Sequence, residues 1–293
     1  MEKFFQILVS GIAVGGIYAI AALGFVLIFK ATRIVNFAQG SLMMLGGYVG
    51  YAAVVTWSLS MPIAFIVSAI AIATVGAVIY LLTLRPVASR AGDTSFAQVI
   101  ITMACTIVIA AVVQYIWGPT QLNMPDIFPS GVFMVGGVRI AWADVGTIGI
   151  TLAVVVVFTA VFRFTRFGLM MRALADNRQA AVMVGANPDL VSAGAWALAA
   201  AVAAIAGMTL TSYGGLNLSF GNIALLAFPA AVLGGIDSIP GALVGGVLIG
   251  IVQQLSGGYI DPAFGQTAGF IVMLIVLMLR PNGLFGSPDI ARI

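Results

Sequence analysis

Long apolar runs with very few charges constrain this chain more than any other feature of its sequence. Of the 293 residues, 62% are hydrophobic and 7% are charged, whereas about a quarter of the residues of an ordinary soluble domain are charged. A helix needs about 20 consecutive apolar residues to span a bilayer. Runs that mostly approach this length lie near residues 4–29, 34–55, 62–84, 97–117, 141–162, 190–212, 223–236, 241–255 and 264–279.

These runs predict an all-α, polytopic membrane protein with eight or nine transmembrane helices in a single transmembrane domain, residues 1–293. The runs at 223–236 and 241–255 are short and rich in glycine. They are therefore expected to include helices that are short, or broken at glycine or proline. Such breaks are tolerated inside a membrane only where protein or a water-filled cavity covers the backbone.

The distribution of arginine predicts how the chain is oriented in the membrane. Four arginines lie in the polar stretch 163–189, at positions 163, 166, 172 and 178, and a basic loop is typically cytoplasmic. Residues 118–140 carry three prolines and little charge, which predicts an external loop without a long helix. Nine full crossings would put the N-terminus outside, and one re-entrant segment would put both termini inside.

Several kinds of chemistry have no residues in this sequence to support them. There is no histidine, and the charged residues lie at or beyond the ends of the predicted spans, which counts against an ion-coupled carrier. No phosphate-binding loop, catalytic constellation or metal-ligand spacing is present. We therefore expect no enzyme activity, no cofactor, no metal and no nucleic-acid partner. Two functions remain possible for such a membrane protein: a passive channel, or a translocation pathway that a partner protein drives.

The cytoplasmic loop carries a pattern that favours the partner-driven pathway. Phe167, Met170, Met171 and Leu174 recur at helical spacing and predict one apolar stripe. Such a helix could lie on the lipid surface or dock in a groove of a cytoplasmic partner, and we favour docking because methionines suit an adaptable contact.

Three ordered motifs resemble permease subunits of branched-chain amino-acid ABC transporters, the LivH-like group. Residues 36–48 (N-F-A-Q-G-S-L-M-M-L-G-G-Y), 227–242 (A-F-P-A-A-V-L-G-G-I-D-S-I-P-G-A) and 280–286 (R-P-N-G-L-F-G) are similar to that group's motifs in the same order. The sequence departs from the family pattern at Leu169, Asp237 and Gln253.

The resemblance implies an importer in the bacterial cytoplasmic membrane. Its other parts would be a second permease chain in a heterodimer, two cytoplasmic ATP-binding subunits that use the ATP, and an external solute-binding protein. It also identifies the loop as a coupling helix that meets an ATPase. The residues assigned to coupling are Phe167, Gly168, Met170, Met171, Arg172, Leu174, Asp176 and Gly185.

The motif residues are candidates for the translocation pathway. They are Asn36, Phe37, Gln39, Gly40, Ser41, Asn222, Phe228, Gly234, Gly235, Pro240 and Gly241. Asn36 and Gln39 either line a wet path or satisfy a buried helix end. The glycines and proline of the second motif are expected to break a helix and expose backbone groups to a cavity. They are Gly234, Gly235, Pro240 and Gly241. Glycines spaced G-x-x-x-G, at 11 and 15, 46 and 50, and 246 and 250, more often signify close helix packing than a substrate site.

The functional hypothesis is import by alternating access, driven by the partner ATPases, of branched-chain-type amino acids or a related small solute. The alternative is an uncoupled channel or facilitator for small neutral solutes such as urea or amides.

Overall fold

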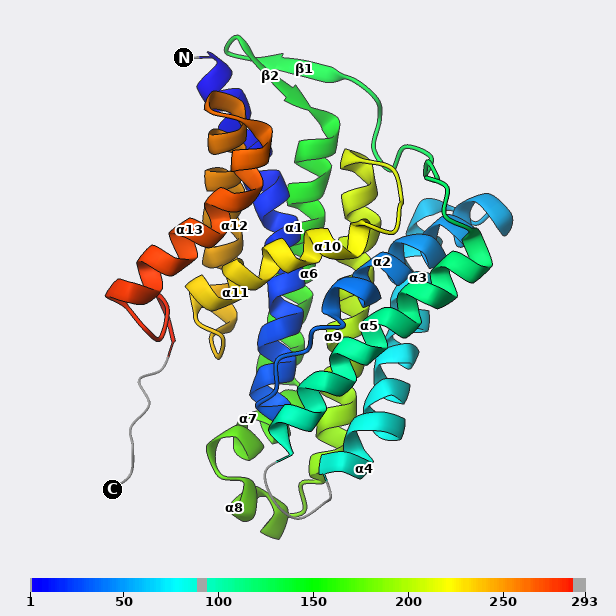
Figure 1. Ribbon diagram of the computed structural model, residues 1–293, viewed down its shortest axis with the longest axis vertical. Helices are drawn as coiled ribbons and strands as arrows, with labels where there is room; N and C mark the ends of the chain where they lie inside the picture. Colours follow the sequence, from blue (N-terminus) through cyan, green and yellow to red (C-terminus); the bar gives the residue numbers. More distant parts are fainter. Residues whose placement is uncertain (1, 89–93, 287–293) are drawn as a thin grey trace.

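The computed structural model describes residues 2–88 and 94–286, and these residues form a bundle of long helices (Figure 1). Seven helices are long and apolar enough to cross a membrane. They are α1 (Glu2–Thr32), α3 (Met61–Ile79) with its continuation through α4 (Arg85–Ala88), α5 (Ser95–Trp117), α6 (Trp142–Phe164), α9 (Pro188–Leu210), α12 (Ile239–Tyr259) and α13 (Pro262–Leu279). The predicted all-α, multi-pass membrane protein is confirmed.

The predicted number of spans is not confirmed, because two of the apolar runs fold as short helices. The run at 34–55 becomes α2 (Gln39–Tyr51), of 13 residues, which continues as a π-helical turn to Thr56. The run at 223–236 becomes α10 (Phe220–Ile223), a 3-10 turn and α11 (Ala227–Gly234). The glycine-rich run at 241–255, expected to include a break, instead belongs to the unbroken 21-residue helix α12.

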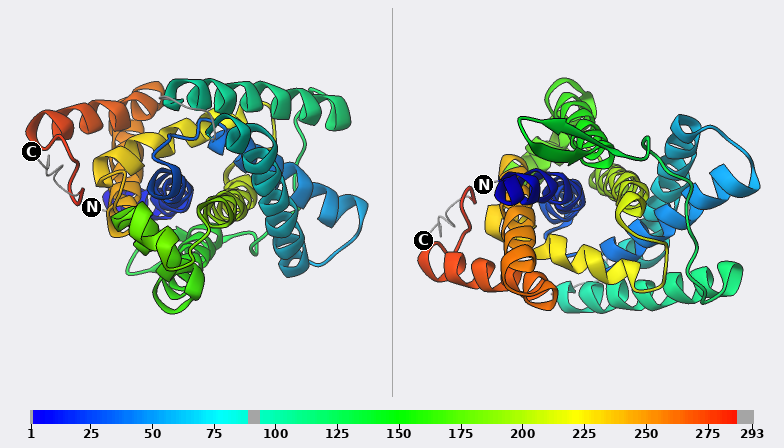
Figure 2. Two further views of the ribbon diagram at one scale, coloured as in Figure 1. Left: turned by 90° about the horizontal axis from the view of Figure 1, so that it is seen from below. Right: turned by 90° about the horizontal axis from the view of Figure 1, so that it is seen from above.

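Helix α1 forms the centre of the bundle. It packs against α6, α9, α11 and α12. Of its most apolar 18-residue stretch, 89% is buried. Seen along the long axis, α1 and α9 lie in the middle, while α5 and α13 lie end to end along one side with α10 and α11 on their inner side (Figure 2). Only 22% of the most apolar 18-residue stretch of α5 and 17% of that of α13 are buried. These two helices therefore form much of the outer surface on that side.

Small residues make the close packing of α1 possible. A Cβ atom added to Gly250 of α12 would lie 2.3 Å from the Cα of Gly15, and one added to Gly246 would lie 2.4 Å from the Cα of Ala19. Gly46 of α2 packs in the same way on Ala204 of α9, where the distance would be 2.4 Å. These G-x-x-x-G spacings therefore serve helix packing, which is the interpretation that the sequence favoured.

The two predicted loops lie at opposite ends of the bundle (Figure 1). Within residues 118–140 the chain forms an antiparallel hairpin of β1 (Val132–Val135) and β2 (Val138–Ala141), and the N-terminus lies at this end. The helices α7 (Arg166–Asp176) and α8 (Arg178–Met183) lie at the other end. Which end is external stays a prediction from the arginine distribution.

The contact between α1 and α12 gives a first prediction. Replacing Gly250 by alanine should lower the free energy of unfolding by about 1–3 kcal/mol, because the new methyl group overpacks a contact that has no room for it. Gly149→Ala on α6 is the matched control, since a Cβ there meets no atom within 4 Å. Thermal unfolding of both purified variants measures the effect, and equal transition temperatures would contradict this role of Gly250.

Candidate functional site

The two broken segments of the chain meet in the middle of the bundle. A Cβ atom on Gly221, at the start of α10, would lie 3.5 Å from the carbonyl oxygen of Gly40. The ring centroids of Phe37 and Phe228 are 6.4 Å apart, and Phe25 of α1 packs on Phe228 at 5.9 Å. The structure thus brings together motif residues that lie far apart in the sequence. For Asn222 it describes the backbone, in α10, while the side chain lies outside the described part.

The amides of Asn36 and Gln39 bond within the protein. Both side chains are completely buried. Asn36 Oδ1 accepts a hydrogen bond from the amide nitrogen of Ala38 at 3.0 Å, and Asn36 Nδ2 donates to Gln39 Oε1 at 3.4 Å. Gln39 Nε2 donates to the carbonyl oxygen of Ala199 in α9 at 3.3 Å. Of the two interpretations, this geometry supports the satisfied helix end.

Two threonines of α5 hold the turn at Phe37, just before α2. Thr102 Oγ1 accepts from the amide nitrogen of Phe37 at 3.2 Å, and Thr106 Oγ1 donates to the carbonyl oxygen of Phe37 at 3.3 Å. Ser41 Oγ donates to the Thr106 carbonyl oxygen at 3.5 Å. Neither threonine is among the site residues predicted from the sequence, although two hydroxyl groups four residues apart in an apolar run are a signal for such a contact.

The third motif closes the C-terminal end of α11. The amide nitrogens of Leu284 and Phe285 donate to the carbonyl oxygens of Leu233 and Gly234, at 2.8 Å and 3.0 Å. We call residues 280–286 the C-terminal strap. Helix α11 does end at the predicted glycines, and the carbonyl oxygen of one of them, Gly234, bonds to the strap. That the other backbone groups of this turn line the pathway stays a prediction.

A tight turn connects α11 to α12. Gly235 has a φ of 107°, and a Cβ atom on Gly234 would lie 2.0 Å from the carbonyl oxygen of Gly241. Ser238 Oγ accepts from the Gly241 amide nitrogen at 3.1 Å, and Pro240 lies in the first turn of α12. Gly234, Gly235, Pro240 and Gly241 therefore act as turn and packing residues here.

The predicted coupling loop folds as two helices. Thr165 Oγ1 accepts from the Gly168 amide nitrogen at 3.2 Å and caps α7, while Asn177 Oδ1 accepts from the Ala180 amide nitrogen at 3.0 Å and caps α8. The expectation of one continuous helix up to Gly185 is therefore wrong, because the cap at Asn177 starts a second helix. Gly185 ends the second helix with a φ of 94°.

The apolar stripe of α7 faces the body of the protein. Met171 is 1% exposed, and Phe167, Met170 and Leu174 pack against the same core. The Arg172 guanidinium donates to the carbonyl oxygen of Phe162 at the end of α6. The stripe is thus covered by the chain itself, as is Gly168, which is buried against the backbone of Phe162.

Other apolar side chains of this loop remain exposed. Leu169 is 60% exposed, and Met183 and Val184 are each 84% exposed. A contact between this loop and another protein would therefore use these side chains together with the exposed Arg172 and Asp176.

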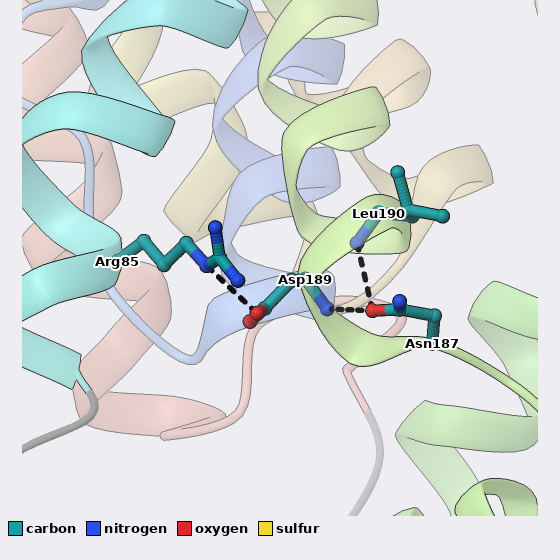
Figure 3. A network of polar contacts seen from close by, with 4 residues as sticks. All are labelled: Arg85, Asn187, Asp189 and Leu190. Atoms are coloured by element: carbon teal, nitrogen blue, oxygen red, sulfur yellow. Dashed lines mark hydrogen bonds and ion pairs between the residues drawn. The ribbon is translucent and has the colours of Figure 1, made fainter.

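One ion pair connects two helices next to this loop (Figure 3). Asn187 caps α9 by accepting from the amide nitrogens of Asp189 and Leu190, at 3.0 Å and 3.3 Å. Asp189 Oδ2 lies 2.8 Å from Arg85 Nε of α4, and the two side chains are 42% and 53% exposed. A pair this exposed stabilises the fold by about 0–1 kcal/mol, so its effect is mainly to fix α4 beside α9.

Among residues 2–88 and 94–286, no group of three or more His, Cys, Asp or Glu side chains could hold a metal ion.

The C-terminal strap gives a second prediction. Gly283 has a φ of 77°, and a Cβ atom there would lie 2.7 Å from both the Gly235 nitrogen and the Val232 oxygen. Gly283→Ala should therefore loosen the strap and speed hydrogen exchange of the Leu284 and Phe285 amides about tenfold or more, as expected for a loss of about 1.4 kcal/mol in local stability. Exchange mass spectrometry of peptides covering 280–286 measures this, with Gly149→Ala as control. Unchanged exchange would contradict the bonds to α11.

Comparison with known proteins is consistent across the whole chain. Residues 7–279 match the family described as branched-chain amino acid transport system / permease component. The high-affinity branched-chain amino acid transport system permease protein LivH of Salmonella typhimurium is 30% identical over 99% of this chain and 98% of its own. BraD of Pseudomonas aeruginosa is 29% identical with the same coverage.

A solved structure shares the fold. PsaBC from Streptococcus pneumoniae, in complex with Fab, matches with a TM-score of 0.52 and 13% identity, covering 95% of this chain and 92% of the other. Three ordered motifs, two broken helices that meet at the centre and a family match over nearly the whole length lead to one conclusion. The chain belongs to the permease family of branched-chain amino acid transport systems.

Proposed function

We propose that this chain is a permease subunit of an ABC importer and forms part of the translocation pathway for branched-chain-type amino acids or a related small solute. The observation that carries the proposal is the family match over residues 7–279. The alternative of an uncoupled channel has no support among the relatives, which are named as permeases of transport systems.

The proposed assembly contains a second permease chain in a heterodimer, two cytoplasmic ATP-binding subunits and an external solute-binding protein, in the bacterial cytoplasmic membrane. The side of the bundle formed by α5 and α13, with α10 and α11 on their inner side, supports a permease partner there (Figure 2). Both helices are mostly unburied within this chain. ATP is used by the partner subunits, and this chain is not assigned enzyme activity or a cofactor.

The contacts suggest how movement of an ATPase reaches the pathway. Helix α7 is fixed to α6 through Arg172 and Phe162 and packs on α9. Helix α9 in turn presents the Ala199 carbonyl oxygen that binds Gln39. A displacement of α7 and α8 would thus move α6 and α9 and, through Gln39, the start of α2. We propose that this path switches the bundle between outward-open and inward-open states.

A third prediction tests the coupling surface. The double substitution Met183→Asp and Val184→Asp should abolish solute-stimulated ATP hydrolysis and uptake in the assembled complex, because two carboxylates replace apolar side chains that would be desolvated on docking. Membrane insertion should persist, since both side chains are 84% exposed in this chain.

The matched control is Met134→Asp, a 65% exposed methionine on the hairpin at the opposite end of the bundle. It should leave hydrolysis and uptake unchanged. ATP-driven uptake of normal rate in the double variant would rule out this surface as the ATPase contact, and solute flux through liposomes that contain this chain alone would favour a channel.

A further inference from the structure

Two neighbouring cavities at the hairpin end of the bundle share three glutamines. One has a volume of about 520 Å³ and lies between α1, α12 and α13. The other, of about 470 Å³, lies between α1, α12 and the end of α9. Gln253, Gln254 and Gln266 line both. We call the second the amide cavity, because Gln121 and Asn217 line it as well.

The amide cavity offers hydrogen-bonding groups that the protein does not fully use. A primary amide has two N–H donors and an acceptor oxygen. Gln254 Nε2 donates to Ser10 Oγ at 3.3 Å, and Gln253 bonds to the Tyr18 hydroxyl. Gln121 and Gln266 also line the cavity and are exposed in this chain. Their amide groups can therefore reach a solute in the cavity.

Backbone pairing and a buried carboxylate fix the wall of this cavity. Leu122 and Leu216 form an isolated antiparallel bridge, with bonds of 2.9 Å and 2.8 Å, which places their neighbours Gln121 and Asn217 at the cavity. The Tyr213 hydroxyl donates to Asp144 Oδ1 at 2.9 Å. Asp144 is 7% exposed and does not itself line the cavity. Its carboxylate therefore fixes the position of the Tyr213 side chain, which does.

The floor of the amide cavity lies next to the centre of the bundle. Phe220 and Leu226 line the cavity, and they come from the segment that includes Gly221, which packs beside Gly40. A solute in this cavity would therefore lie directly above the junction of the broken segments.

We propose that the amide cavity is the outer site at which the permease receives a free amino acid. Amide N–H groups would bind the α-carboxylate, and amide oxygens, including that of Gln266, would bind the α-ammonium group. The side chain would pack on Phe220, Leu226 and Leu210. No Asp, Glu, Lys or Arg is among the described residues that line this cavity, which favours a zwitterion with no net charge over an ion. This inference rests on the proposed function.

Uptake kinetics test the roles of two amides. In liposomes that contain the assembled transporter and its binding protein, Gln253→Leu and Gln121→Leu should each raise the KM for L-leucine about tenfold or more, as expected when a bond to a charged group is lost, with a smaller change in kcat. The control is Thr74→Leu on α3, an exposed polar residue outside both cavities and away from the proposed partner contact, for which KM should not change. KM values of the two cavity variants within twofold of wild type would overturn the site.

A binding measurement separates this inference from the proposed function. Gln266→Cys, made in a Cys105→Ser background, places a thiol at the edge of the cavity for reaction with a membrane-impermeant maleimide. Millimolar L-leucine should slow the reaction at least severalfold, whereas 4-methylpentanoate and isopentylamine, which each lack one charged group, should not.

Equal labelling rates with and without L-leucine would overturn the site even if uptake is normal. Absence of ATP-driven uptake by the wild-type assembly would instead contradict the proposed function, and protection by leucine would still support the site.

Discussion

Backbone polar groups inside a membrane have no water to bond, and this constraint decides how the broken helices of this chain are built. Just before α2, the Phe37 amide group donates to Thr102 and the Phe37 carbonyl group accepts from Thr106. At the end of α11 the carbonyl groups of Leu233 and Gly234 bond to the C-terminal strap. The breaks can exist in the middle of the bundle because α5 and the strap satisfy them. Two of the three sequence motifs thus belong to one structural unit.

The same principle gives the polar side chains of the pathway region a structural role. Asn36 and Gln39 use their amides to shape the entry to α2 and to join it to α9. The amide groups that are open to the amide cavity lie closer to the hairpin end, at Gln121 and Gln266. Polar groups that hold the backbone and polar groups that are open to a solute therefore occupy different levels of the bundle.

The apolar runs of the sequence predicted the long helices, and the ordered motifs predicted the family. Other features depend on contacts that a single sequence does not contain. Periodicity placed Phe167, Met170, Met171 and Leu174 on one face, but which surface covers that face depends on α6 and α9. The break between α7 and α8 results from the N-cap at Asn177. The apolar periodicity of the loop gives no sign of this cap. Gln121, Asn217 and Gln253 come from separate segments, and only the folded bundle brings them together.

The burial of α1 has a consequence for biosynthesis. Helix α1 leaves the ribosome before its main neighbours α9 and α12, which begin at Pro188 and Ile239, although its most apolar stretch is 89% buried in the finished bundle. Until those helices are inserted, the small-residue surface of α1 faces lipid or the insertion machinery. The centre of the bundle is therefore completed only when α12 packs against a helix that entered the membrane long before it.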